Sequence, residues 1–225
     1  MVEVCGKPII GHQVDSLLES GLTDITVVVG YKSEMVSAYL GSKCKYLVNE
    51  EFESTGSLHT MMIAREEYEG QSFLLLNADV VFDNECVSQI INSSYETAAL
   101  VDPEQDLKDG EMNVIVGNDK RITAFSKLVP AKEATALSLQ IVKFSGKDSK
   151  LLFNRASILM QERITQLFPA KAYDSIIDHS SLYAIIHKKG FWAEIDTLDD
   201  YKNCELSLSE YLKDNLIENS PEYNK

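Results

Sequence analysis

The feature that most constrains the fold is a run of four apolar residues, Phe73–Leu76, followed closely by the carboxylate of Asp79. A continuous apolar run of this length suits a strand that is buried on both faces, as in a parallel sheet covered by helices. Asp79 falls where such a strand ends, and in open α/β sheets the carboxyl ends of the strands form the ligand crevice. Two interpretations stay open here. Asp79 belongs to a metal or phosphate site, or Asn77-Ala78-Asp79 is only the turn after a strand.

The first half of the chain alternates between helical and strand patterns on both sides of this run. Ser57 is placed to cap the helix expected over 58–67, which precedes the apolar run, and Pro8 suits the first turn of the first helix. Such an alternation predicts a parallel sheet with helices on both faces. The expected elements are a helix over 7–20, a strand over 25–29, a helix over 33–40, a strand over 45–48, a helix over 58–67, the strand from 73 and a helix over 84–93.

The second half changes character, because a hairpin pattern surrounds the turn at 117–120. The fold class predicted is therefore α/β, with a Rossmann-like mixed, mostly parallel sheet, helices on both faces and a small antiparallel section. Residues 1–217 are expected to form one domain, and residues 218–225 a flexible tail. The expected elements are strands over 98–101, 113–116, 122–126, 138–144 and 182–186, and helices over 148–167 and 198–216.

Net charge limits the partners of this chain. A formal charge of -14 argues against a nucleic-acid or anionic-membrane surface as partner, and no apolar run reaches the length of a membrane span. An anionic substrate would need a divalent cation together with local Lys, Arg or backbone N–H groups. The four cysteines are far apart and form no CxxC pair, which predicts reduced thiols in a cytoplasmic protein.

Several short stretches between about residue 2 and about residue 206 share their order and spacing with one enzyme family. Together they resemble the sugar-nucleotidyltransferase superfamily, and within it the cytidylyltransferases that act on phosphocholine and on phosphonates such as 2-aminoethylphosphonate. The stretches are Val4-Cys5-Gly6-Lys7-Pro8-Ile9-Ile10, Val28-Val29-Gly30-Tyr31, Asn49-Glu50-Glu51-Phe52, Thr55-Gly56-Ser57-Leu58, Leu75-Leu76-Asn77-Ala78-Asp79-Val80-Val81-Phe82 and Trp192-Ala193-Glu194-Ile195-Asp196-Thr197.

The resemblance implies a reaction and its partners. Members of the superfamily transfer a nucleotidyl group from a nucleoside triphosphate to a phosphate or phosphonate and release pyrophosphate. For this chain it implies an Mg²⁺-dependent enzyme that transfers CMP from CTP, or the nucleotide of another NTP, to a small phosphocholine-like acceptor. The expected assembly is a homodimer. Because an acceptor oxygen attacks the α-phosphorus in line, catalysis would consist of positioning and charge neutralisation.

The resemblance also implies roles for individual residues. Asp79 and Asp196 match the two aspartates that hold the metal, and Lys127 matches a lysine that meets the phosphate group of the acceptor. Asp174 and Glu194 fall in the acceptor region. The residues implied for nucleotide binding are Asn49, Thr55, Gly56, Ser57, Asn77 and Ala78.

One departure from the family concerns the N-terminus. The family places a first strand and a glycine-rich triphosphate loop before the segment at which this chain begins, and no other stretch has such a loop. The sequence therefore predicts an N-terminally incomplete domain, from a misplaced start, a truncated gene or a fragment. Two other hypotheses stay open: a nucleotidyltransferase for sugar or inositol phosphates, and a truncated, non-catalytic remnant of the family.

Overall fold

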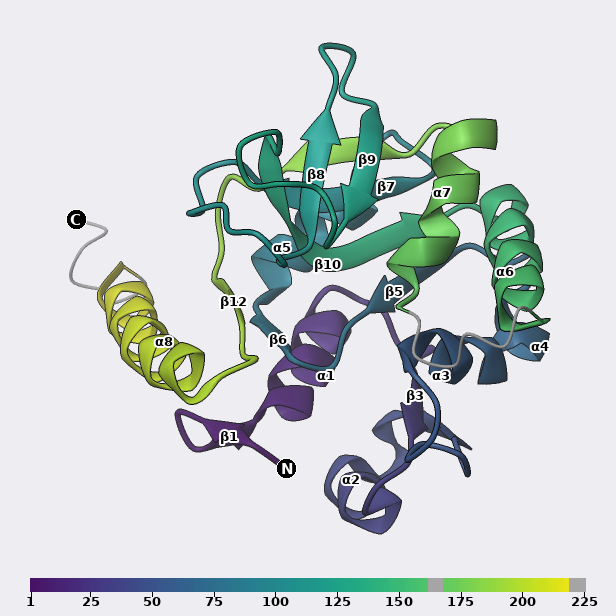
Figure 1. Ribbon diagram of the computed structural model, residues 1–225. Helices are drawn as coiled ribbons and strands as arrows, with labels where there is room; N and C mark the ends of the chain where they lie inside the picture. The colour runs from purple at the N-terminus through teal and green to yellow at the C-terminus, as the bar shows by residue number, and fades with distance from the viewer. Residues whose placement is uncertain (162–167, 219–225) are drawn as a thin grey trace.

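A computed structural model describes residues 1–161 and 168–218, and it arranges helices on both faces of a mixed sheet (Figure 1). Among these residues, no helix combines the length and the apolar character needed to cross a bilayer. The helices are α1 (Ile9–Glu19), α2 (Ser33–Leu40), the 3₁₀ turn η1 (Gly41–Lys43), α3 (Ser57–Ile63), α4 (Arg65–Tyr68), α5 (Asn84–Ile91), α6 (Gly146–Gln161), α7 (Ala170–His179) and α8 (Leu198–Glu218).

The strands fall into one large sheet and three separate pairs. The strands are β1 (Glu3–Val4), β2 (Lys7–Pro8), β3 (Thr26–Val29), β4 (Lys45–Val48), β5 (Phe73–Leu76), β6 (Val80–Phe82), β7 (Ala98–Asp102), β8 (Asn113–Val116), β9 (Ile122–Ser126), β10 (Ala136–Phe144), β11 (Tyr183–Ile186) and β12 (Trp192–Glu194). The large sheet has the order β11-β7-β10-β8-β9, and β5 also pairs with β10. The separate pairs are β1-β2, β3-β4 and β6-β12.

The sheet is mixed, which confirms the predicted fold class. The pairs β3-β4 and β7-β11 are parallel, whereas β10 runs antiparallel to β5, β7 and β8. The predicted hairpin over 113–126 is the antiparallel pair β8-β9. Among the described residues, β3 and β5 are hydrogen-bonded to other strands and not to each other.

The long strand β10 separates two hydrophobic cores. Val142 and Phe144 face the core that includes residues of α3, α6 and α7, and Leu139 and Ile141 face the core that includes residues of α1 and α5. Side chains alternate between the faces of a strand, so this segment places apolar side chains in the cores on both of its faces. A third, smaller core holds α8 against β6.

Several expected element ends differ from the structure by one or two residues, and three of the differences have a clear physical cause. Gly56, and not Ser57, is the N-cap of α3, because the Gly56 carbonyl accepts the first helical hydrogen bonds, and Ser57 is the first helical residue. The helix expected over 58–67 is interrupted at Ala64, where a ψ of 2° breaks the helical path into α3 and α4. Pro8 precedes the first helix as an extended residue paired in β2. The last part of the helix expected over 148–167, from residue 162, lies outside the described residues. Nearly all of the tail expected over 218–225 does so too.

Asp83, directly after β6, joins three segments through its carboxylate. One oxygen accepts hydrogen bonds from the backbone N–H groups of Glu85 and Cys86, at 3.1 and 3.2 Å, and so caps α5. The other oxygen accepts from the Phe191 backbone N–H at 3.0 Å and from the hydroxyl of Tyr211 on α8. A single carboxylate thus fixes the ends of β6, α5 and the strand that carries residues 192–194.

We expect Asp83→Ala to lower the free energy of unfolding by about 2–4 kcal/mol, because it removes a helix cap and leaves buried donors unpaired. Urea denaturation measures this loss. Tyr211→Phe removes one of these bonds and should cost about 1–2 kcal/mol. The exposed Asp199→Ala is the matched control and should stay within about 0.5 kcal/mol of the parent. Equal losses for Asp83→Ala and Asp199→Ala would contradict the junction role.

Candidate active site

The pairing of β6 with β12 brings together carboxylates that are far apart in the sequence. Glu194 lies opposite Val80 in this antiparallel pair, and the backbone N–H of Ile195 donates to the Asp79 carbonyl at 2.9 Å. Asp79 precedes β6 and Asp196 follows β12, so both aspartates lie at the same end of the pair. The sequence prediction that Asp79 and Asp196 share a site therefore has the geometry it requires.

Asp79, Glu194 and Asp196 form a carboxylate cluster. One oxygen from each lies within 4.8 Å of the others. Burial and the neighbouring Asp196 raise the pKa of Asp79. Burial, with Asp196 and Asp79 nearby, raises the pKa of Glu194 to about 7. Three like charges this close oppose one another, so the cluster is poised to accept a cation or a proton.

The cluster suits a divalent cation with hard character. The Asp79 Oδ1 atom is buried and has no hydrogen-bond partner among the described residues. A buried carboxylate oxygen without a partner is costly, and a metal ion would satisfy it. Carboxylate oxygens are the ligands that Mg²⁺ prefers. The residues present thus fit the Mg²⁺ site that the sequence predicts, with Glu194 as a third donor that the sequence did not assign to the metal.

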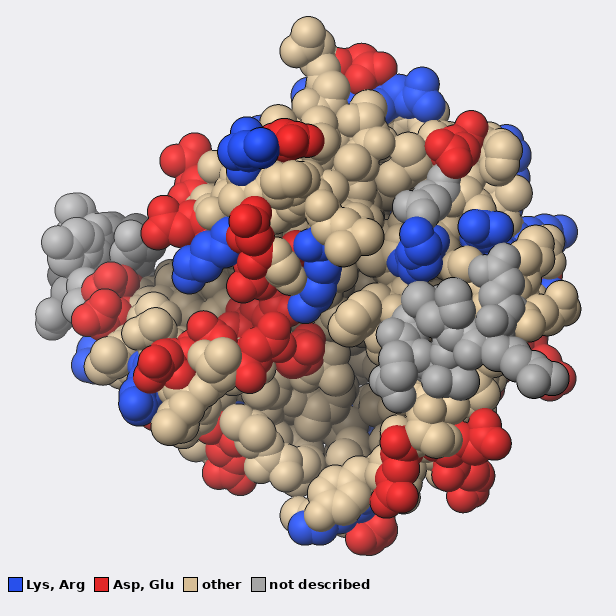
Figure 2. Space-filling view, in the orientation of Figure 1, with Lys and Arg blue, Asp and Glu red and all other residues tan. Residues whose placement is uncertain are grey.

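Lys127, just after β9, lies beside the cluster. Its ammonium is 4.0 Å from Asp196 and lies 5.2 Å from the centre of the Phe168 ring. Figure 2 shows acidic side chains gathered on the left of the central hollow, near β12 and the start of α8, with basic side chains close by. The lysine therefore lies between the carboxylates and an aromatic surface, where an anionic group could meet it.

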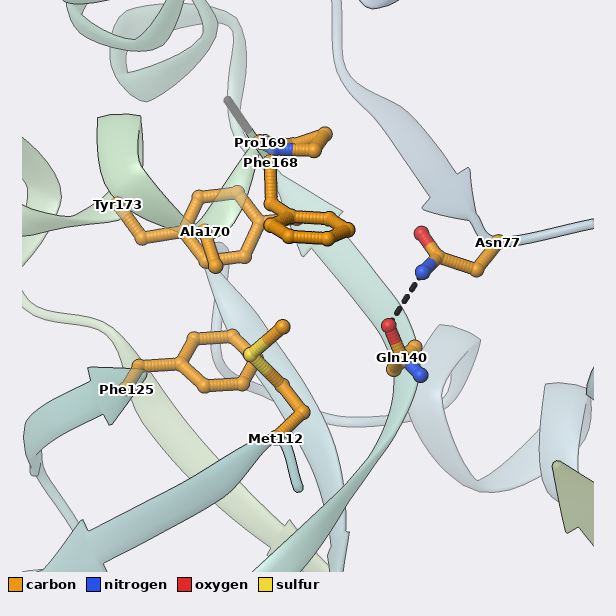
Figure 3. A pocket seen from close by; sticks show the side chains of 8 residues that line it. All are labelled: Asn77, Met112, Phe125, Gln140, Phe168, Pro169, Ala170 and Tyr173. Atoms are coloured by element: carbon orange, nitrogen blue, oxygen red, sulfur yellow. Dashed lines mark hydrogen bonds between the residues drawn. The ribbon is translucent and has the colours of Figure 1, made fainter. Parts of the chain in front are cut away.

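Figure 3 shows a pocket with two different walls. It is linked to the cluster by Gln140, which lines the pocket and donates a hydrogen bond to Glu194. One wall is largely apolar and includes three aromatic rings, with Phe125 stacked on Tyr173 at a centroid distance of 4.9 Å. The other wall is formed by the amides of Asn77 and Gln140, which are hydrogen-bonded to each other. The lining residues are Asn77, Met112, Phe125, Gln140, Phe168, Pro169, Ala170 and Tyr173.

Gln13 on α1 holds the loop that carries Asp79. Its buried amide donates to the carbonyls of Asn77 and Val80, each at 2.7 Å. These bonds fix the loop on both sides of Asp79. Sequence reasoning placed 7–20 in a helix and missed this role, although a glutamine on the buried face of an apolar helix needs partners.

The residues predicted to bind the nucleotide fall into two groups. Asn77 and the exposed Ala78 lie in the loop next to the carboxylates. Asn49, Thr55 and Gly56 lie between β4 and α3, and Ser57 is the first residue of α3. The buried Asn49 amide donates to Thr55 at 3.2 Å and to Thr60 at 3.1 Å, so Asn49 shapes this loop from within.

The acceptor region predicted around residue 174 lies in α7. The side chain of Asp174 is outside the described residues, so its predicted role stays a prediction. Its neighbour Tyr173 is buried against Phe125, and burial raises the pKa of its hydroxyl. Phe168 and Phe125 had no pattern in the sequence that distinguished them from ordinary core residues.

The chain matches curated proteins over different shares of their lengths. It is 26% identical over 228 residues to the CTP:phosphoglutamine cytidylyltransferase of Campylobacter jejuni, which covers 89% of this chain and 88% of the relative. It is 35% identical over 147 residues to the bifunctional protein GlmU of Symbiobacterium thermophilum, over 60% of this chain. The chain spans 29% of the length of that second relative.

A solved structure and a family profile complete the comparison. The CTP:phosphocholine cytidylyltransferase of Streptococcus pneumoniae superposes with a TM-score of 0.74 at 17% identity, over 92% of this chain and 88% of that one. This likeness shows that the two share a fold. The profile of the MobA-like NTP transferase domain matches residues 1–144, which is more than half of the chain. The chain therefore belongs to the MobA-like NTP transferase domain family, a family of nucleotidyltransferases.

Proposed function

We propose that this protein transfers CMP from CTP to a small phosphorylated or phosphonate acceptor and releases pyrophosphate. The observation that carries the proposal is the cluster of Asp79, Glu194 and Asp196 with Lys127 at its edge. The name of the Campylobacter relative, a cytidylyltransferase that covers nearly the whole chain, supports CTP as the donor.

The reaction proposed needs no covalent enzyme intermediate. An oxygen of the acceptor phosphate forms a bond to the α-phosphorus of CTP, and the bond from that phosphorus to the bridging oxygen breaks to release pyrophosphate. Mg²⁺, when bound by Asp79, Asp196 and Glu194, would neutralise negative charge on the nucleotide phosphates. Lys127 holds the anionic end of the acceptor, and the remaining task of the chain is to keep both reactants aligned.

The pocket favours an acceptor whose other end is apolar or cationic. Aromatic ring faces attract ammonium groups, and the Lys127 ammonium already lies over Phe168. Six of the eight lining residues lack a charged group or a side-chain amide, so a sugar with many hydroxyls would find few hydrogen-bond partners there. Phosphocholine and aminophosphonates therefore come before sugar and inositol phosphates as candidate acceptors.

The test of this function is pyrophosphate release by residues 1–225, with CTP and Mg²⁺, across a panel of phosphocholine, 2-aminoethylphosphonate, a sugar 1-phosphate and an inositol phosphate. We expect turnover with CTP and one of the first two acceptors. Turnover only with the sugar or inositol phosphate would contradict the proposed acceptor class and identify the protein as a nucleotidyltransferase for sugar or inositol phosphates. No pyrophosphate release with any acceptor would refute the proposal, and a lack of CTP binding in a calorimeter would then favour a non-catalytic remnant.

Asp79→Asn should lower kcat by at least about 100-fold, because it removes a charged oxygen from the place where the nucleotide phosphates must be neutralised. The fold should be kept, since the change relieves repulsion within the cluster. Circular dichroism and a thermal melt check the fold, and the exposed Asp199→Asn is the matched control. Activity equal to that of the control would refute the assignment.

Glu194 also makes stability depend on pH. Its pKa is about 7 in the folded chain against a reference of 4.5, so the folded state binds more protons between these values. The protonated Glu194 carboxyl therefore contributes to the free energy of unfolding at low pH, and this contribution is lost as the pH rises through about 7. At pH 8 without metal, Glu194→Gln should be more stable than the parent by about 1–2 kcal/mol, after allowance for solvent screening.

Thermal melts from pH 5 to pH 8 in the presence of a chelator measure this difference. The gap between Glu194→Gln and the parent should narrow toward pH 5. Adding Mg²⁺ at pH 8 should raise the melting temperature of the parent more than that of the variant. Parallel melting curves over the whole range would contradict a strained carboxylate cluster.

A further inference from the structure

Gln140 has a backbone conformation that is unusual for its place in the fold. It lies within the buried strand β10, yet its φ is +57°, in the left-handed region that favours glycine. The register between β10 and β7 shifts between Ser138 and Val142, and the Gln140 N–H is satisfied by the Ser138 hydroxyl at 3.0 Å. A strained bulge of this kind changes the direction in which a side chain of the strand points.

The side chain of Gln140 is buried and fully engaged at its amide. Its carbonyl oxygen accepts from the amide of Asn77, and its NH₂ group donates to Glu194 Oε1 at 2.5 Å. Figure 3 shows the Gln140 and Asn77 amides facing each other across the polar side of the pocket. Two hydrogen bonds, one of them to a carboxylate, offset the cost of the left-handed backbone.

The two partners of Gln140 have equivalent places in the site. Asn77 lies two residues before Asp79, and Glu194 lies two residues before Asp196. One amide therefore ties the loop that carries the first aspartate to the strand that leads to the second. Because β10 belongs to the large sheet and β6-β12 is a separate pair, this link also fixes the pair against the sheet.

We propose that Gln140 is a positioning residue for nucleotidyl transfer, an inference that rests on the proposed function. It holds Glu194 and Asn77 in place, and through them sets the separation of Asp79 and Asp196. Its side chain also lines the pocket proposed for the acceptor. Gln140 therefore fixes the position of the acceptor relative to the carboxylates. Gln140 acts through these neighbours and takes no part in bond making.

The decisive variant is Gln140→Gly, because glycine accepts the left-handed backbone without strain and removes both hydrogen bonds. We expect a melting temperature close to that of the parent, because relief of the backbone strain opposes the loss of the two hydrogen bonds. We also expect kcat/KM for the acceptor to fall about 10- to 100-fold, as when a supporting hydrogen bond behind a site residue is lost.

The matched control is Lys120→Gly. Lys120 is also a non-glycine residue with a left-handed backbone, at φ +65°, but it lies exposed in the β8-β9 turn. The substitution Lys120→Gly relieves the same kind of backbone strain away from the pocket. It should leave kcat and the KM values for CTP and for the acceptor unchanged. Gln140→Asn, whose shorter amide also tolerates this backbone, should fall between the parent and the glycine variant.

A second readout keeps the inference separate from turnover. Mg²⁺ alone should raise the melting temperature of the parent and of Lys120→Gly at lower concentrations than that of Gln140→Gly. If the parent has no turnover, the proposed function fails, and this titration still decides the role of Gln140. Equal Mg²⁺ midpoints and, where there is turnover, equal acceptor KM values for the parent and Gln140→Gly would overturn the proposal.

Discussion

The candidate site depends on the short antiparallel pairing of β6 with β12. This pair places Asp79, which follows the apolar strand β5, beside Glu194 and Asp196 from the last part of the chain. Among the described residues, the pair shares no strand pairing with the large sheet, so side-chain contacts must hold it in place. The Trp192 indole donates to the buried Asp102 at the end of β7 at 2.9 Å and supplies one of them. Asp83 and Gln140 supply others from opposite ends of the pair.

Neutral amides carry out most of the positioning around the carboxylates. Gln13 holds the loop before β6, and Gln140 joins Asn77 to Glu194. An added carboxylate would increase the repulsion that already raises the pKa values of Asp79 and Glu194, and an added cation would compete with the metal. An amide donates and accepts without a net charge, so it can order a charged cluster and leave the cluster's affinity for a cation intact.

The sequence predicted those parts of the site that local pattern controls. An apolar strand that leads toward Asp79 and a helix cap at Thr197 follow from apolar runs and capping residues. In the structure β5 ends at Leu76, three residues before Asp79, and the Thr197 hydroxyl and Asp200 are bonded to each other. The mixed sheet also followed from the pattern of elements. Gln140 did not, because a bulge arises from pairing between distant strands and its glutamine looks like any polar residue in a strand. The aromatic wall was hidden for a similar reason, since core and pocket phenylalanines have the same local pattern.

The charges of the site suggest how one small region can handle two anions in a chain of net charge -14. Anionic substrates are repelled by Asp79, Glu194 and Asp196 until a cation neutralises them, so the nucleotide is favoured to arrive with its metal. The acceptor meets a different surface, where Lys127 lies between Asp196 and the Phe168 ring. A metal ion held by the carboxylates would weaken the attraction of Asp196 for Lys127, and the Lys127 ammonium would then be available to an acceptor phosphate. The same carboxylates would in this way couple nucleotide binding to acceptor binding without any movement of the backbone.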